Sequence, residues 1–210
     1  PEVGSLVAQA CARHLVPAKL ELGGKGAAVV LDGDPVKIAK ALVKVITMNA
    51  GQVCFTASRW LIRRSIYDAF VEAATTLMAK VRVGYWSDLK TRMGPVISEV
   101  QRVRALEIVD RALAAGASHL QWKDPDRAEP GYFLHPGLLT GPVENPAADE
   151  EIFGPIAYVT PFDSDEEAVS MVNRSPYGLV NNGTIFAEGS VGLTINPSSG
   201  GFTNNGTLGG

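Results

Sequence analysis

Residues 20–54 read LELGGKGAAVVLDGDPVKIAKALVKVITMNAGQVC, and this stretch decides the fold. Residues 27–31 form a short apolar run, Ala-Ala-Val-Val-Leu, which is typical of a buried strand. Asp34 and Pro35 then mark the start of a helix, because Asp caps helix amino ends and Pro fits the first helical position. The apolar residues of this helix keep a period near 3.6, at positions 36, 38, 39, 42, 43 and 46. The stretch therefore predicts a buried strand, a capped helix and a loop that ends at Cys54.

The same alternation of strands and helices continues on both sides of this stretch. Strands are predicted at 59–63 and 156–160, and helices at 4–15, 66–80, 98–115 and 164–172. Strands that alternate with helices favour a parallel sheet covered on both faces. The predicted fold class is therefore α/β, a three-layer, mostly parallel sheet with helices on both faces. Open sheets of this kind bind ligands at the carboxyl ends of their strands, and the Cys54 loop is expected at that edge.

Composition excludes several classes of protein. The chain has 210 residues, 46% hydrophobic residues and a net charge of −3, which argues against a disordered chain and against a nucleic-acid binder. It contains no apolar run long enough to span a membrane and does not open on a signal-peptide pattern. Its two cysteines do not make a disulfide framework, so a reduced, cytoplasmic protein is expected. The three histidines have no metal-ligand spacing, and no metal is predicted.

Two residues of the opening stretch have the chemistry of covalent acyl transfer. Cys54 supplies a nucleophilic thiol, and Glu21, 33 residues earlier, supplies a base that can activate water. Each also has a simpler interpretation, since a lone cysteine is usually a small buried hydrophobe and a carboxylate before two glycines often solvates a turn. Cys11, on an Ala-rich helical face, is predicted to be such a core cysteine. Lys25 is expected to face solvent or to pair with a nearby carboxylate.

The motifs of this chain resemble those of the NAD(P)-dependent aldehyde dehydrogenase superfamily. The matching segments are Leu20–Lys25, Asn49–Cys54, Met93–Ser98 with Gln101, Gly131–Pro136 (a strand in the family), Glu150–Pro155, and Asn173 with Tyr177–Leu179. They follow the family's order over roughly residues 1–186. Asn49, Gly51 and Gln52 in register with Cys54 favour the nucleophile over the buried hydrophobe.

The resemblance implies a mechanism for aldehyde oxidation. Cys54 attacks the aldehyde carbon to give a thiohemiacetal, a hydride leaves to the nicotinamide, and a thioester remains. Glu21 then activates the water that releases the acid, and the backbone N–H of Cys54 forms half of an oxyanion hole. Phe55, beside the nucleophile, hints at an apolar or aromatic aldehyde.

The resemblance also implies a cofactor, NAD or NADP, and the residues that hold it. Glu151 accepts hydrogen bonds from the ribose hydroxyls on the nicotinamide side. Phe153 packs near the nicotinamide ring, and the backbone carbonyl of Leu22 holds the carboxamide. Core packing is the alternative role of Phe153.

The same resemblance implies a division of the chain into three parts. Residues 1–20 are the last helix and linker of a dinucleotide-binding domain, 21–186 are the catalytic domain, and 187–210 are a shortened C-terminal segment. The rest of the dinucleotide-binding domain and a segment between Phe186 and Val191 are expected to be missing. A homodimer or homotetramer is expected for a full-length parent, with a small aldehyde as its other partner.

Two other functions stay open at this point. The chain is either the catalytic part of an aldehyde dehydrogenase or a non-catalytic, truncated family member that binds partners or oligomerises. A cofactor-independent thiol esterase, which needs only Cys54 and Glu21, is the third hypothesis.

Overall fold

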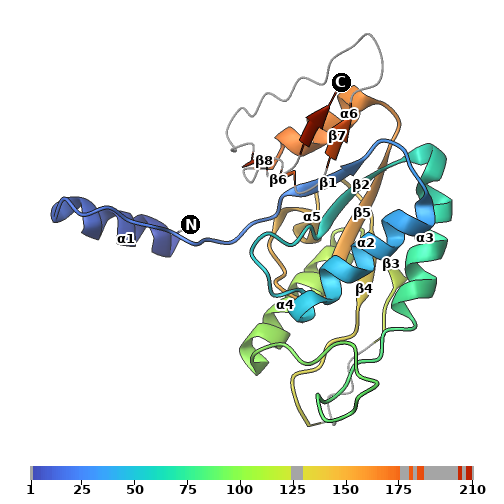
Figure 1. Ribbon diagram of the computed structural model, residues 1–210, viewed down its shortest axis with the longest axis horizontal. Coiled ribbons are helices and arrows are strands. Elements are labelled where there is room, and N and C mark those ends of the chain that lie inside the picture. The colour runs from blue at the N-terminus through green and yellow to red at the C-terminus, as the bar shows by residue number, and fades with distance from the viewer. Residues whose placement is uncertain are drawn as a thin grey trace.

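The computed structural model describes residues 2–123 and 130–175 with their side chains (Figure 1). Four short strands of the tail are described by their backbone alone. They are β6 (Val180–Asn181), β7 (Thr184–Phe186), β8 (Thr203–Asn204) and β9 (Thr207–Gly209), and β6 pairs with β8 and β7 with β9, both in parallel. The predicted short connection between Phe186 and Val191, and the late strand after it, lie outside the described residues.

A five-stranded sheet forms the centre of the fold. Its order is β1 (Ala27–Val30), β2 (Arg59–Arg63), β5 (Ile156–Phe162), β4 (Gly137–Thr140) and β3 (Ser118–Gln121). Neighbouring strands run parallel except at one edge, where β3 runs antiparallel to β4. The predicted α/β class with a mostly parallel sheet is therefore confirmed.

Helices cover both faces of this sheet, as the alternation of side chains along β5 requires. Ala157 and Val159 of β5 pack with α2 (Pro35–Thr47) and α3 (Arg64–Met78) on one face. Ile156 and Tyr158 pack with the other layer, which contains α4 (Glu99–Ala114) and α5 (Pro146–Asp149). The helix α6 (Asp165–Asn173) covers β1 and β2 on the same side as α4 and α5. The core strands are thus buried on both faces, which explains their continuous apolar sequences.

The predicted helix starts are confirmed by their caps. Asp34 accepts hydrogen bonds from the backbone N–H groups of Val36 and Lys37, at 2.9 and 3.3 Å. Ser98 and Ser164 cap α4 and α6 in the same way. Each cap satisfies backbone donors that have no partner inside the helix.

The first helix, α1 (Glu2–Arg13), projects away from the sheet (Figure 1). Gly4 is its only buried residue, and Cys11 is partly exposed. The prediction of a core position for Cys11 is wrong, because the Ala-rich face of α1 is not packed on the sheet.

One strand prediction is wrong, and the strand β3 was not predicted. Residues 131–136 are not a strand, since β4 begins only at Gly137. No pattern predicts β3, because its residues Ser-His-Leu-Gln lack an apolar run, and only its pairing with β4 makes it a strand.

Candidate active site

Three loops that carry the motifs meet at one edge of the sheet. Residues 20–26 lead into β1, the Cys54 loop leads into β2, and residues 150–155 lead into β5. These strands are parallel neighbours, so the three loops gather at their amino ends. The expected position at the carboxyl ends is therefore wrong. A loop that runs from a helix into a parallel strand always arrives at the amino end of that strand.

The backbone before Cys54 has an unusual, left-handed conformation. Asn49, Ala50 and Gly51 have φ values of 50°, 53° and 73° in the short 3₁₀ segment η1 (Met48–Gly51). A Cβ added at Gly51 would lie 2.1 Å from the carbonyl oxygen of Gly154. Only glycine fits this position, because both the φ angle and the contact exclude a side chain. Strained backbone of this kind concentrates at functional sites.

Side-chain amides hold this loop in place. The Asn49 amide donates to the carbonyl of Gln52 at 3.0 Å, and the Gln52 amide donates to the carbonyl of Asn49 at 3.0 Å. The Gln52 side-chain oxygen also accepts a hydrogen bond from the backbone N–H of Ile97, at 2.8 Å. The loop is therefore fixed both to itself and to the segment that leads into α4.

Cys54 lies at the corner of a turn and is exposed. The Thr56 N–H donates to the Val53 carbonyl at 2.9 Å, which places Cys54 and Phe55 at the two central positions of the turn. Cys54 is a free thiol, and the Phe55 side chain beside it is 59% exposed. The structure thus presents the thiol to solvent instead of burying it as a small hydrophobe.

The Gly23–Gly24 turn connects the Cys54 loop to Glu151. A Cβ at Gly24 would lie 2.8 Å from the Cys54 carbonyl oxygen, and one at Gly23 would lie 2.0 Å from a carboxylate oxygen of Glu151. The Gly24 N–H donates to the other carboxylate oxygen of Glu151, at 3.2 Å. Two glycines in succession therefore let the carboxylate and the nucleophile loop approach the same peptide.

Phe153 is held in place by Gln101 of α4. The Gln101 amide donates to the carbonyls of Ile152 and Phe153, both at 2.9 Å. Phe153 has a φ of 54°, which is costly for an aromatic residue, and these two hydrogen bonds hold the backbone there. Phe153 is half-buried, so neither the cofactor role nor the packing role is excluded.

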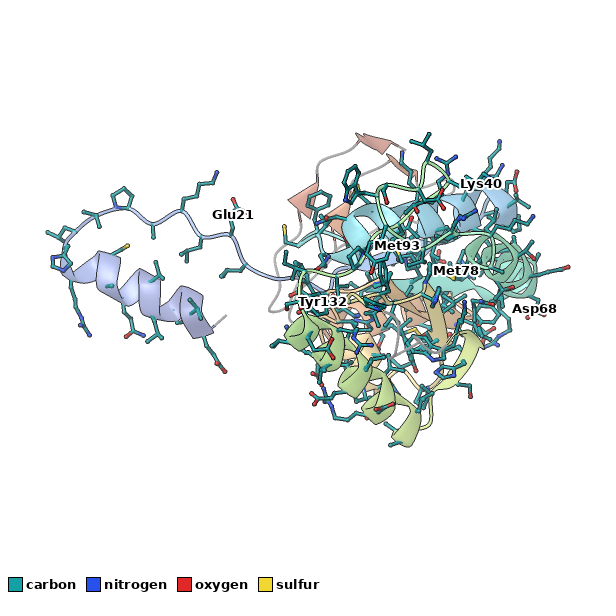
Figure 2. All side chains as sticks on the ribbon, turned by 90° about the horizontal axis from the view of Figure 1, so that it is seen from below. Glu21, Lys40, Asp68, Met78, Met93 and Tyr132 are labelled. Carbon is teal, nitrogen blue, oxygen red and sulfur yellow. The ribbon has the colours of Figure 1, made fainter. Side chains whose placement is uncertain are left out.

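Glu21 and Leu22 lie on the arm that joins α1 to the body. Figure 2 shows Glu21 on this arm, outside the folded body. Its carboxylate is 76% exposed and forms an ion pair with Lys19 at 3.7 Å. Leu22 is 44% exposed and packs against Gly4 of α1. The structure therefore brings together the Cys54 loop and Glu151, through the two glycines, and does not bring Glu21 into that contact.

Lys25 is fully buried, so the expectation that it faces solvent is wrong. Its ammonium has no hydrogen-bond partner among the described residues. Burial, together with the positive charge of Arg59, lowers the pKa of Lys25 to about 7, while Glu151, Asp149 and Glu150 act in the opposite direction. Arg59 is itself buried, and desolvation lowers its pKa.

The carboxylate of Glu150 has a strong partner on α4. Arg111 of α4 binds it with two hydrogen bonds, at 2.6 and 2.8 Å. This guanidinium holds the pKa of Glu150 below its usual value. The double contact fixes the segment after α5 to α4.

The described part of the chain has neither a metal cluster nor a membrane-spanning helix. Within residues 2–123 and 130–175, no three His, Cys, Asp or Glu side chains are close enough together to hold a metal ion. None of the helices in the described part of the chain is both long and apolar enough to span a membrane.

Sequence reasoning missed the structural roles of Gln52, Gln101 and Lys25. Both glutamines lie in or beside the quoted motifs, yet nothing in the sequence shows which carbonyls their amides reach. For Lys25 a signal existed, because a charged residue directly before an apolar strand is unusual at the start of a buried sheet.

Comparisons with known proteins agree with this architecture. The aldehyde dehydrogenase family model matches residues 1–189. The chain is similar to 4-(hydroxymethyl)benzenesulfonate dehydrogenase TsaD1 of Comamonas testosteroni, with 38% identity over 89% of this chain and 38% of that protein. It is similar to 2-aminomuconic 6-semialdehyde dehydrogenase of a Pseudomonas species, with 34% identity over 85% of this chain and 38% of that protein.

A solved structure gives the same result. The chain is similar to betaine aldehyde dehydrogenase of Staphylococcus aureus in complex with NAD⁺, with a TM-score of 0.80, 28% identity, and coverage of 99% of this chain and 41% of that one. The chain spans about two fifths of the length of the relatives it matches. With the family model matching most of its residues, this chain belongs to the aldehyde dehydrogenase family.

Proposed function

We propose that the gene product containing this chain oxidises an aldehyde to a carboxylic acid with NAD⁺ or NADP⁺, through a thioester on Cys54. The observation that carries the proposal is the meeting of three motif loops at the Gly23–Gly24 turn, with an exposed thiol on one side and the Glu151 carboxylate on the other. Family membership supports the same chemistry.

The reaction starts at the sulfur of Cys54. The thiolate adds to the aldehyde carbon and gives a thiohemiacetal, whose oxyanion accepts a hydrogen bond from the Cys54 backbone N–H. Loss of hydride from that carbon leaves a thioester on Cys54. Glu21 takes a proton from water as the water attacks the thioester, the C–S bond breaks, and the carboxylic acid leaves.

Glu21 must move for this role. Its side chain is exposed on the arm, and among the described residues its ion-pair partner is Lys19, so it is free to turn toward the thioester. Glu21 is three residues from Gly24, where an added Cβ would lie 2.8 Å from the Cys54 carbonyl oxygen, so the arm enters the body next to the Cys54 loop. The surface pair with Lys19 opposes this movement only weakly.

The residues around the turn fit the nicotinamide half of a dinucleotide. Glu151 offers carboxylate oxygens for ribose hydroxyls, Leu22 offers a backbone carbonyl for the carboxamide, and Phe153 offers an aromatic face beside them. The dinucleotide, when bound, supplies the acceptor for the hydride. A relative that carries NAD⁺ in its structure supports this assignment.

The proposed function also implies a division of the chain into domains. Residues 1–20 belong to the end of a dinucleotide-binding domain, 21–186 form the catalytic domain, and 187–210 belong to its C-terminal region. The separation of α1 from the sheet supports the first boundary (Figure 1). The assembly is a homodimer or homotetramer in a reducing, cytoplasmic environment.

Phe55 suggests the class of aldehyde. Its exposed aromatic ring adjoins the nucleophile, which favours an apolar or aromatic substrate. One relative has an aromatic substrate in its name, 4-(hydroxymethyl)benzenesulfonate.

Steady-state kinetics with the complete gene product tests the proposal. Cys54→Ser is expected to abolish aldehyde-dependent NAD(P)H formation, and Glu21→Gln to give one burst of NAD(P)H followed by slow thioester hydrolysis. Cys11→Ser is the matched control and should turn over normally. Normal turnover by both Cys54→Ser and Glu21→Gln would contradict the proposal.

The same assays separate the two alternatives. A non-catalytic, partner-binding family member would form no NAD(P)H with any aldehyde in a broad panel. A cofactor-independent thiol esterase would hydrolyse an activated ester without a nucleotide, and would lose this activity in Cys54→Ala.

A further inference from the structure

The backbone N–H of Cys54 is a donor that the loop leaves available. Within the described part of the chain it donates to no backbone or side-chain acceptor. The peptide between Val53 and Cys54 is trans, and its carbonyl accepts the Thr56 N–H at 2.9 Å. Because the N–H of a trans peptide points opposite to its C=O, this hydrogen bond turns the Cys54 N–H away from Thr56. The donor therefore lies at an exposed residue with its hydrogen-bonding capacity unused.

The peptide before it is fixed by a pair of side-chain amides. The Asn49 amide donates to the Gln52 carbonyl and the Gln52 amide donates to the Asn49 carbonyl, each at 3.0 Å. The Asn49 carbonyl also accepts the backbone N–H of Gln52, at 3.1 Å. Together with the Thr56 contact, these bonds hold the carbonyls of the two consecutive peptides that lead to the Cys54 N–H. The direction of that N–H is therefore set by the loop itself.

The Gln52 side chain also connects this amide pair to the start of α4. While its amide nitrogen bonds Asn49, its Oε1 accepts the Ile97 N–H at 2.8 Å. The next residue, Ser98, caps α4 by accepting the Gln101 N–H, so the donor peptide belongs to a fixed helix start. A side chain bonded at both ends restricts the rotation of the turn between them. Gln52 is thus the link between the nucleophile loop and a rigid element.

We propose that Gln52 is a positioning residue, whose amide orients the Cys54 backbone N–H toward the oxyanion that forms on the aldehyde oxygen. The inference rests on the proposed function, in which this oxyanion belongs to the thiohemiacetal of Cys54, and deepens it by assigning the group that aims its donor. Gln52 itself takes part in no covalent step, because its amide bonds Asn49 and Ile97 within the protein.

This role has a signature that a merely stabilising residue lacks. An oxyanion donor acts when negative charge develops on the aldehyde oxygen, so its misorientation slows aldehyde oxidation without weakening dinucleotide binding. Alkylation of a thiol by iodoacetamide forms no oxyanion and depends on the exposure and ionisation of the sulfur. Loss of the Gln52 amide should therefore affect oxidation far more than alkylation of Cys54.

Three measurements on the complete gene product test the proposal. They are kcat/KM for an aromatic aldehyde at saturating NAD⁺, the Kd of NAD⁺ from a fluorescence titration, and the rate of Cys54 alkylation by iodoacetamide. Gln52→Met keeps the length of the side chain and removes its hydrogen bonds, and should lower kcat/KM by about 100-fold, the effect of losing one oxyanion donor. The Kd and the alkylation rate should stay near their parental values.

Two further variants sharpen the test. Gln52→Glu keeps an acceptor for the Ile97 N–H but, when ionised, has no proton to donate to the Asn49 carbonyl, so its kcat/KM should fall between those of the parent and Gln52→Met. Gln121→Glu makes the same chemical change on β3, at the edge of the sheet opposite β1, and should match the parent in all three measurements.

Each outcome decides between the claims. Parental kcat/KM in Gln52→Met would overturn the role of Gln52 and leave the proposed function intact. Equal losses in oxidation, alkylation and NAD⁺ affinity would also overturn it, because they would show a collapsed loop instead of a misdirected donor. If Gln52→Met does not fold, Gln52→Glu is judged by the same criterion, and a loss confined to kcat/KM supports the proposal. A parental protein that forms no NAD(P)H with any aldehyde of a broad panel would overturn the proposed function and this inference together.

Discussion

At the scale of single residues, the site is made by close contact between backbone segments. Gly23, Gly24 and Gly51 each stand where a Cβ would collide with Glu151, the Cys54 carbonyl or Gly154. These contacts bring three loops within reach of one another. The glycines of the motifs therefore act sterically, because the absence of a Cβ lets the loops approach closely.

Gly51→Ala tests the steric role of one of these glycines. The new methyl would enter a left-handed residue and lie 2.1 Å from the Gly154 carbonyl oxygen, so the Cys54 loop must shift. We expect a loss of about 2 kcal/mol of unfolding free energy and a changed rate of Cys54 alkylation by iodoacetamide. Gly94→Ala, where no atom lies within 4 Å of the new Cβ, is the matched control. Equal melting and alkylation of both variants would contradict the account.

Sequence reasoning found Cys54 and Glu151 but not what supports them. The motifs predict Cys54 as the nucleophile and Glu151 as the cofactor carboxylate, because the types of residue and their order are visible in one dimension, and both roles stay predictions. The amide bridges of Gln52 and Gln101 and the burial of Lys25 depend on which loops meet, and that follows only from the strand order. The role of Glu21 stays a prediction.

At the scale of elements, α2 connects the first strand of the sheet to the nucleophile loop. Its start is fixed by Asp34, which caps two backbone N–H groups, and its buried face packs on α3 and β2. The end of α2 runs directly into the left-handed residues before Cys54. The stability of this helix therefore bears on the geometry of the thiol.

Asp34→Ala should lower the unfolding free energy by about 1 kcal/mol, because two orphan donors of α2 lose their acceptor. Chemical denaturation measures the change. Lys40→Ala, on the exposed side of the same helix, serves as the control and should stay within about 0.5 kcal/mol of the parent. A loss of similar size in both variants would show that the cap contributes nothing specific.

The Arg111–Glu150 contact predicts a pH dependence of stability. The guanidinium lowers the pKa of Glu150 in the folded chain, so this stabilisation is complete above the ordinary value of 4.5 and is lost as the pH falls through the folded value. Arg111→Gln should therefore lose less stability than the parent between pH about 4.5 and about 3. Arg92→Gln, at an exposed position in the loop before α4, is the control. Thermal melts over this pH range that coincide for parent and Arg111→Gln would refute the coupling.

Elements were predictable where the pattern is periodic. The 3.6-residue period and the caps identified α2, α3, α4 and α6, and the apolar runs identified β1, β2 and β5. The polar strand β3 was missed, because its pairing partner lies 19 residues later and its own sequence is not strand-like. The prediction that the site lies at the carboxyl ends of the strands was also wrong. The rule behind it concerns loops that follow strands, whereas the three motif loops precede their strands.

At the scale of the whole molecule, apolar side chains on and after α1 are exposed to solvent. Val3 and Leu6 of α1 are 71% and 65% exposed, and Leu15, two residues after the helix, is 93% exposed. Exposed apolar surface of this kind favours association. We expect the 210-residue chain expressed alone to aggregate or to associate, and the complete gene product to be a soluble homo-oligomer.

Size-exclusion chromatography with light scattering checks this. A replacement of Leu6 and Leu15 by Ser in the isolated chain should reduce the associated fraction, whereas replacement of the exposed Lys37 and Lys40 by Ser should not. A clean monomer of about 22 kDa with cooperative melting would contradict the expectation.

The central claim is that Cys54 carries the acyl group during aldehyde oxidation, and one measurement tests it most directly. The Glu21→Gln variant of the complete gene product is mixed with an aromatic aldehyde and NAD⁺, quenched in acid during turnover, digested, and mapped by mass spectrometry. We expect one acyl adduct, on the peptide that contains Cys54, which raises the peptide mass by the aldehyde less two hydrogens and whose amount equals the NADH burst. An adduct on Cys11, or NADH formation with no adduct on Cys54, would contradict it.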